Sequence, residues 1–193
     1  MKHLLIATKN QDKLNIICAL IDKLAPSKFI FSDLKSAEID CEIEETGSIL
    51  ERSEQKAREV FGILSEKQKQ QFWAVLGIDD GFDLKQDGPG DPDSKTFAHA
   101  LLVGKAASIG ETIWIKRGFA LCNRSGMQSI MTALPFRYVG NPNGVSAKED
   151  GYPLAKVLTP IVGNVLHSQM SKTDLVDYYE KYLGESLSKL LSL

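Results

Sequence analysis

The stretch LLIATKNQDKL (residues 4–14) joins an apolar run to a polar turn and the start of an amphipathic segment. Four consecutive apolar residues at 4–7 are typical of a strand covered on both faces. Apolar residues then recur at helical spacing over 14–24, and Thr8 and Asn10 are both good helix N-caps. A helix N-terminus presents free backbone N–H groups and a partial positive charge. The pattern predicts strand, turn and helix, with the turn either a phosphate site or an ordinary cap beside two solvated lysines.

The composition excludes several classes of protein. The chain has 193 residues, of which 43% are hydrophobic and 25% charged, and its formal net charge is -2. This length supports one good core. It carries no basic tail, no apolar run of membrane-spanning length and no signal-peptide pattern, and its three cysteines lack metal-ligand spacing. We therefore expect a cytoplasmic protein with a single domain over residues 1–193 that binds neither nucleic acid nor membrane.

The hydropathy pattern predicts an α/β fold over the rest of the chain. Apolar and alternating runs predict strands at 28–32, 72–78, 96–104 and 111–122. Helical spacing predicts helices at 48–64, 126–134 and 171–193. Segment 37–47 is expected to be a loop or edge segment, and segment 154–163 is expected to be extended. Under this interpretation residues 72–121 form a β-meander around the turn 86–95.

Two adjacent carboxylates, Asp79 and Asp80, follow the apolar strand predicted at 72–78. In open α/β sheets ligands bind outside the carboxyl ends of strands, so this pair and the turn after the first strand are expected to face one cleft. Adjacent carboxylates repel, and a divalent cation bridging them to phosphate would relieve the repulsion. The alternative is a plain Asp80-Gly81 hairpin turn. A third acidic candidate, Glu51, lies in the first turns of the helix at 48–64, where it is either a ligand or a capping residue.

Three motifs in this order resemble the inosine triphosphate pyrophosphatase (ITPase-like) superfamily. They are A-T-x-N-x-x-K at residues 7–13, E-T-G with a following Glu and K-A-R at residues 45–58, and G-I-D-D-G at residues 77–81. Members hydrolyse deaminated purine nucleoside triphosphates with magnesium. The resemblance covers roughly the first half of the chain. It implies an elongated mixed α/β fold with two lobes, a central cleft and a homodimer.

The resemblance also implies roles for individual residues. Glu51 and Asp79 would hold magnesium, with manganese as the alternative, and Asp80 would be the candidate base. Lys13 would act in catalysis as well as in binding. The expected substrate-binding residues are Thr8, Lys9, Asn10, Lys13, Lys56, Tyr152 and Lys172.

Two branches of the superfamily are compared with the chain. The main branch reads D-D-S-G-L at the acidic pair and follows it with a helical insertion. The inosine/xanthosine triphosphatase branch has a strand that turns straight back, and the sequence from GIDDGF into the expected meander is more similar to it. The chain departs from the main branch at Arg52 and Ser53, lacks the aspartate of G-Y-D-P at 151–153, and has Lys172 where Ser-His-Arg ends. Lysine lacks the bidentate fork of arginine, so these departures bear on base recognition and rate.

The sequence therefore predicts a magnesium-dependent hydrolase of ITP, dITP and XTP that removes aberrant nucleotides from the pool. The products are a monophosphate and pyrophosphate, or a diphosphate and phosphate in the triphosphatase branch. Two alternatives stay open: a nucleotide-binding relative without catalysis, and a pyrophosphatase for modified pyrimidine triphosphates. A donor that recognises the carbonyl at position six of the base is expected within residues 140–172.

Overall fold

The computed structural model describes residues 1–91, 93–146 and 153–193, and a mixed six-stranded sheet lies at its centre. The strands are β1 (Lys2–Ala7), β2 (Phe29–Asp33), β3 (Ala74–Asp83), β4 (Thr112–Asn123), β5 (Gly126–Tyr138) and β6 (Leu158–Pro160). The helices are α1 (Gln11–Leu24), α2 (Ile49–Ile63), α3 (Glu66–Gln71), α4 (Ser94–Leu102) and α5 (Lys172–Leu191), with short 3-10 helices at Pro153–Lys156 and His167–Gln169.

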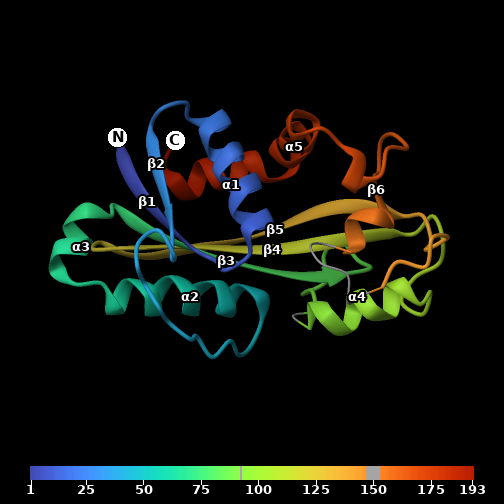
Figure 1. Cartoon of the computed structure of the whole chain (residues 1–193), viewed down its shortest axis with the longest axis horizontal. Helices are drawn as coiled ribbons and strands as arrows, with labels where there is room; N and C mark the ends of the chain where they lie inside the picture. Colours follow the sequence, from blue (N-terminus) through green and yellow to red (C-terminus); the bar gives the residue numbers. More distant parts are fainter. Residues whose placement is uncertain (92, 147–152) are drawn as a thin grey trace.

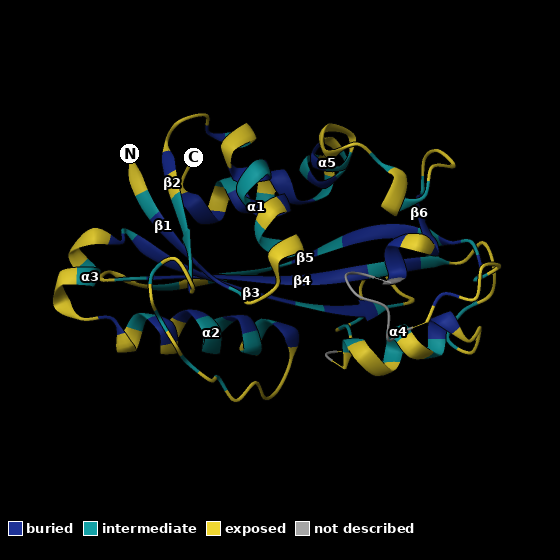
Figure 2. Ribbon diagram, in the orientation of Figure 1, coloured by how far each residue is buried: buried dark blue, intermediate teal, exposed yellow. Residues whose placement is uncertain are grey.

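The strand order is β2-β1-β3-β4-β5-β6, with the first three strands parallel and the pairs from β3 to β6 antiparallel. Helices α1 and α5 cover one face of the elongated sheet and α2 covers the other, as Figure 1 shows. Strands β1, β3 and β4 are mostly buried between these helices, whereas β2 and the first half of β5 are partly exposed. The outer surfaces of the helices are exposed (Figure 2). The predicted α/β class, a mixed sheet flanked by helices, is confirmed.

The N-terminal unit has the predicted strand, turn and helix. Asn10 is the N-cap of α1, and its Oδ1 accepts a hydrogen bond from the Lys13 backbone N–H at 3.0 Å. The Thr8 hydroxyl accepts from the Asn10 backbone N–H at 3.2 Å. Of the two candidate caps, Asn10 caps the helix and Thr8 orders the turn before it. Such a cap stabilises a helix by about 1 kcal/mol.

Strand β3 is longer than predicted, and the acidic pair lies inside it. It pairs with β1 as far as the Ala7–Gly77 register position and with β4 as far as the Asp83–Trp114 position. Strand β1 therefore ends before β3 reaches Asp79, and the edge of β3 is open toward the turn after β1. The alternative of a hairpin turn at Asp80-Gly81 is wrong, because the strand continues past both residues.

Two glycines allow the backbone of α2 to lie directly on the sheet. A Cβ at Gly77 would lie 2.1 Å from the Ser53 carbonyl oxygen, and one at Gly118 would lie 2.9 Å from the Ile49 carbonyl oxygen. Both distances are too short for a real side chain, so α2 sits against β3 and β4 only because these positions carry none. This close approach brings Lys56, on α2, over the middle of β3.

The strand predicted at 96–104 is wrong, because the segment forms α4. The Asp93 side chain caps this helix by accepting from the Thr96 backbone N–H at 3.1 Å. Phe97 stacks on Phe82 with ring centroids 5.2 Å apart, and Leu101 is fully buried. Residues 72–121 therefore include a helix between two strands and are not a β-meander.

The helix predicted at 126–134 is also wrong, because this segment lies in β5. It pairs with β4 along its length, starting at the tight turn where Asn123 faces Gly126. A short apolar run has ambiguous periodicity, and the ladder of hydrogen bonds to a neighbouring strand decides its conformation. Segment 154–163 is extended only in part, since a 3-10 helix precedes β6.

The C-terminal helix α5 begins as predicted, with the Ser171 hydroxyl accepting from the Asp174 backbone N–H at 3.1 Å. Its buried side chains include Tyr179, Leu183 and Leu187, which join the core shared with α1 and the sheet. None of the helices in the described ranges is both long enough and apolar enough to cross a membrane.

Candidate active site

A cavity of about 320 Å³ lies between the turn after β1, α2 and β3. It is lined by Ala7, Thr8, Lys9, Asn10, Lys13, Leu34, Cys41, Ile43, Glu45, Lys56 and Asp79. Three lysines and two carboxylates are thus gathered around one hollow. The prediction that the turn and the acidic pair share a cleft is confirmed for Asp79, whereas Asp80 is not among the described residues that line the cavity. A second hollow of about 560 Å³ adjoins it and shares Thr8, Lys9, Asn10 and Leu34.

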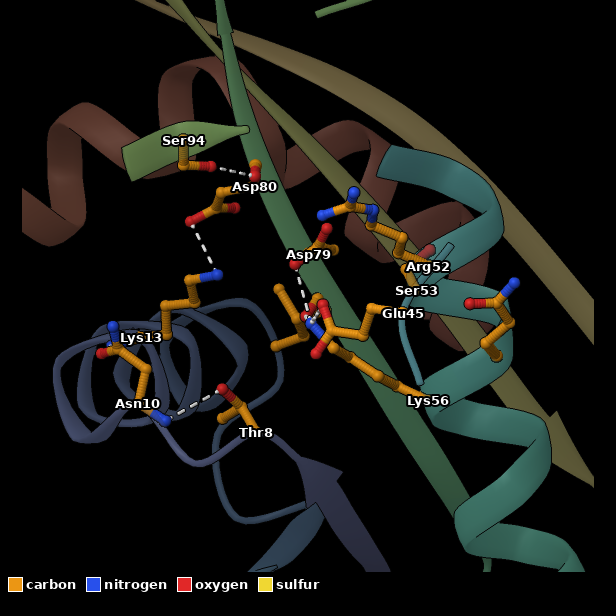
Figure 3. Close-up of polar contacts among 12 residues, drawn as sticks. Thr8, Asn10, Lys13, Glu45, Arg52, Ser53, Lys56, Asp79, Asp80 and Ser94 are labelled. Carbon is orange, nitrogen blue, oxygen red and sulfur yellow. Dashed lines mark hydrogen bonds and ion pairs between the residues drawn. The ribbon is translucent and has the colours of Figure 1, made fainter. Parts of the chain in front are cut away.

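The two neighbouring aspartates point to opposite faces of the sheet. Side chains alternate along a strand, and the glycines at 77 and 81, which share a face with Asp79, pack on α2. Asp80 points to the other face, where α1 and α5 lie. Figure 3 shows Asp80 directed toward Lys13 and Asp79 directed toward Lys56. The adjacent carboxylates therefore have separate surroundings.

Asp79 is buried and only half paired. Its Oδ1 accepts from the Lys56 ammonium at 2.7 Å, and the same ammonium lies 3.0 Å from Glu45 Oε2 and donates to the Ile78 carbonyl at 3.2 Å. The other oxygen, Asp79 Oδ2, is buried without a hydrogen-bond partner in the part of the chain that the structure describes. Leaving such an atom unsatisfied costs about 1–3 kcal/mol, so a water molecule or a cation is expected there.

Asp80 is held by two cations. Arg117 on β4 donates from Nε to Oδ1 at 2.6 Å and from Nη2 to Oδ2 at 2.9 Å, which is a bidentate pair. Lys13 Nζ lies 3.2 Å from Oδ2. Burial raises the pKa of the Asp80 carboxyl, but the charges and hydrogen bonds of Arg117 and Lys13 outweigh it and hold the pKa well below its usual value. This environment does not favour Asp80 as a general base, because such a base is most effective with a pKa near the working pH.

The sequence suggested that a divalent cation relieves the repulsion between the adjacent aspartates. In the structure each carboxylate has its own cation, Lys56 for Asp79 and Arg117 with Lys13 for Asp80. The alternation of the strand separates the charges, and the protein's own side chains neutralise them. The repulsion is therefore no argument for a metal ion that binds both.

Glu51 does not have the position expected of a metal ligand beside Asp79. Its Oε2 accepts from the backbone N–H and the hydroxyl of Ser48, at 2.7 and 2.8 Å, in a capping box at the start of α2. The backbone hydrogen bond from Ser48, followed by that from its side chain, lowers the pKa of Glu51. Glu51 is exposed and is not among the described residues that line the cavity. The carboxylate that the structure brings toward Asp79 is Glu45.

The other predicted substrate-binding residues divide into three groups. Thr8, Lys9, Asn10, Lys13 and Lys56 line the cavity. Lys172 is the exposed first residue of α5 and is not among the described lining residues. Tyr152 lies outside the described residues.

Three residues that the sequence analysis did not single out take part in the site. Arg117 is 4% exposed, and Tyr179 of α5 lies over its guanidinium with Cζ 5.3 Å from the ring centroid. The signal for Arg117 was a pair of cations inside an otherwise apolar strand, at 116–117. Glu45 was part of the quoted E-T-G motif but received no role. Tyr179 carried no signal beyond helical spacing.

The donor set can be tested against magnesium. In the described ranges no group of three or more His, Cys, Asp or Glu side chains is placed to hold a metal ion. Magnesium usually binds one or two carboxylates and completes its shell with water and substrate phosphate oxygens. The unpaired Asp79 oxygen with Glu45 nearby fits this requirement for a metal that arrives with phosphate. It does not fit a permanent all-protein cage.

The fold is similar to that of other proteins of known structure. A HAM1 protein from Coxiella burnetii superposes with a TM-score of 0.64 and 17% identity, covering 100% of this chain and 99% of that one. A nucleoside-triphosphatase / dITP/XTP pyrophosphatase from Mycobacterium abscessus superposes with a TM-score of 0.54 and 16% identity, covering 97% of each chain. No protein-family model and no curated protein sequence matches the chain. The chain has the ITPase-like fold, which confirms the predicted resemblance at the level of structure.

Part of the similarity to the inosine/xanthosine triphosphatase branch rested on the β-meander expected at 72–121. That premise is removed, because α4 lies between β3 and β4. The choice of branch therefore stays a prediction.

Proposed function

We propose that the protein is a magnesium-dependent hydrolase of nucleoside triphosphates, with deaminated purine nucleotides (ITP, dITP and XTP) as its substrates. The observation that carries the proposal is the cavity in which the capped N-terminus of α1, three lysines and the half-paired Asp79 converge. A triphosphate needs cations and N–H donors along its length, and these residues supply both. The ITPase-like fold supports the choice of nucleotide.

The proposed roles follow from the geometry. Lys9, Lys13 and the first turn of α1 bind phosphate oxygens, and the Thr8 hydroxyl orders that turn. Asp79, with Glu45 beside it, would hold magnesium, and Lys56 keeps the Asp79 carboxylate oriented. When bound, magnesium would neutralise charge that develops on the phosphate oxygens.

In the proposed reaction water attacks the α-phosphorus, and the bond to the bridging oxygen of the β-phosphate breaks. The monophosphate and pyrophosphate leave, and the proton from water passes to solvent. Attack at the γ-phosphorus gives a diphosphate and phosphate. The pyrophosphatase named among the similar structures supports the first outcome for this chain.

The test is a panel of ITP, dITP, XTP, ATP, GTP and modified pyrimidine triphosphates, each incubated with magnesium and with a chelator. We expect pyrophosphate from the deaminated purines only, and none with the chelator. Binding of ITP without any product would identify a nucleotide-binding protein that lacks catalysis. Preference for a modified pyrimidine would transfer the proposal to that substrate class. We also propose a homodimer, which sedimentation equilibrium tests directly.

A further inference from the structure

The side of β3 that carries Asp80 holds a chain of charges in which the proposed reaction gives a role to Lys13 but none to Asp80 or Arg117. Arg117 grips both oxygens of Asp80, and Asp80 Oδ2 also meets Lys13. The Arg117, Asp80 and Lys13 side chains are 5%, 14% and 19% exposed. These three residues, here called the charge triad, come from β4, β3 and α1.

The triad carries two positive charges and one negative charge, so its net charge is +1. Lys13 is the member that lines the cavity, while Arg117 lies deeper, under the ring of Tyr179. Without Arg117, Lys13 and Asp80 would form a neutral pair, and a phosphate would have to compete with a buried carboxylate for the lysine. With Arg117, the carboxylate keeps a bidentate partner when Lys13 turns to phosphate.

We propose that Arg117 is a positioning residue that neutralises Asp80 and so leaves the charge of Lys13 available to the triphosphate. This inference rests on the proposed function, and it gives Asp80 the role of an anchor for Lys13. Arg117 itself does not contact the substrate. The bidentate geometry and the low exposure of the guanidinium support this role, because an arginine that bound phosphate directly would have to lie at the cavity wall.

The net charge of the triad predicts the order in which the parent and its variants bind tripolyphosphate. The parent triad has net charge +1, Arg117→Met has 0, Asp80→Asn has +2, and the double variant returns to +1. At separations of 4–6 Å a unit charge changes anion affinity by about tenfold or more near a protein surface. Arg117→Met is therefore expected to bind tripolyphosphate about tenfold more weakly than the parent. The double variant is expected to recover to within about threefold, and Asp80→Asn to bind at least as tightly as the parent.

The experiment is titration calorimetry with inorganic tripolyphosphate on the full chain at low salt, with the folded state of each variant checked by thermal unfolding. Arg124→Met is the matched control. Arg124 lies at the β4–β5 turn, where it forms an exposed ion pair with Glu66, so this variant also removes one arginine charge. We expect its affinity to lie within about twofold of the parent. Replacing both members of a buried ion pair is usually better tolerated than replacing one. If Arg117→Met does not fold, the affinity of the double variant for tripolyphosphate is therefore the deciding measurement.

Recovery of binding in the double variant supports the inference where thermal unfolding shows that Arg117→Met is folded, because the weaker binding of that single variant then comes from the uncompensated charge of Asp80 and not from a loss of the fold. Equal affinity of Arg117→Met and the parent overturns it. So does a double variant, or Asp80→Asn, that binds tenfold more weakly than the parent. A parent protein that binds neither tripolyphosphate nor ITP would instead overturn the proposed function, which keeps the two failures distinct.

Discussion

Asp79 and Asp80 are identical residues in consecutive positions, yet the structure gives them different chemistry. Asp79 faces α2, lines the cavity and keeps one buried oxygen without a hydrogen-bond partner among the described residues. Asp80 faces α1 and α5, and both of its oxygens are engaged by cations. The alternation of side chains along a strand accounts for the difference, since one residue step transfers a side chain to the other face. Two adjacent acidic residues in a strand therefore lie in two different environments.

The largest expected effect is the difference in turnover between variants of the two aspartates. Asp79→Asn is expected to lower the turnover of ITP by about 100- to 1000-fold, or 3 to 4 kcal/mol, because it removes the charge proposed to hold magnesium. Asp80→Asn is expected to lower turnover by less than tenfold. Initial rates at saturating ITP and magnesium measure both. A loss of 100-fold or more in Asp80→Asn, with magnesium affinity retained, would restore Asp80 as the base.

A second prediction concerns stability on the Asp80 side, where His167 lies near Arg117. Burial and then the Arg117 charge lower the pKa of His167 to about 4, whereas an unfolded histidine titrates near 6.5. Between these values the unfolded chain binds more protons, so the free energy of unfolding is expected to fall as pH drops from 6.5 toward 4. The contribution is up to about 3 kcal/mol.

Urea unfolding at pH 7 and pH 4.5 measures this contribution. His167→Gln is expected to reduce the difference in unfolding free energy between the two pH values. His99→Gln, at an exposed position on α4, is the matched control. An unchanged difference in the His167 variant would show that this side of the sheet is more hydrated than the structure indicates.

Lys13→Ala is expected to weaken triphosphate binding by about 10- to 100-fold and monophosphate binding by much less, because its charge should meet the distal phosphates. Calorimetry with ITP and IMP gives both affinities. The control is Lys23→Ala, which removes a lysine from the other end of α1, where it pairs with Asp177 and Glu180. Equal losses for the two nucleotides would mean that Lys13 does not reach the distal phosphates.

The smallest effect compares two glutamates near the start of α2. Glu45→Gln is expected to raise the magnesium concentration needed for half-maximal activity several-fold, because Glu45 lies beside the Asp79–Lys56 pair. Glu51→Gln is expected to change it by less than twofold, because glutamine also completes a capping box. The reverse order would return Glu51 to the metal site and show that its carboxylate leaves Ser48 when nucleotide binds.

Much of the site could be predicted from local sequence. The strand at the N-terminus, the Asn10 cap and the helix after it depend on contacts within a few residues, and the structure has all three. The same holds for the helix over 48–64 and for the C-terminal helix. The position of Asp79 at the same cavity as the turn after β1 was predicted because both polar clusters follow apolar strands, and parallel pairing brings these strands together.

The elements that could not be predicted depend on distant partners. Segment 126–134 is a strand because it pairs with β4 through a ladder of hydrogen bonds. Helix α4 forms where Phe97 and Leu101 pack into the core. The residues that pair with Asp79 and Asp80 could not be predicted from the sequence either. Arg117 is 37 residues from Asp80, and Lys56 is 23 residues from Asp79.

The sequence by itself determined which residues carry charge and where the chain turns, because caps, periodicity and turn residues act locally. The tertiary structure decided which charges meet. It placed Asp79 with Lys56 and Glu45 and placed Asp80 with Arg117 and Lys13, because the register of β3 between β1 and β4 fixes the face to which each side chain points. Glycine at 77 and 118 then let α2 approach closely enough for Lys56 to reach its partner.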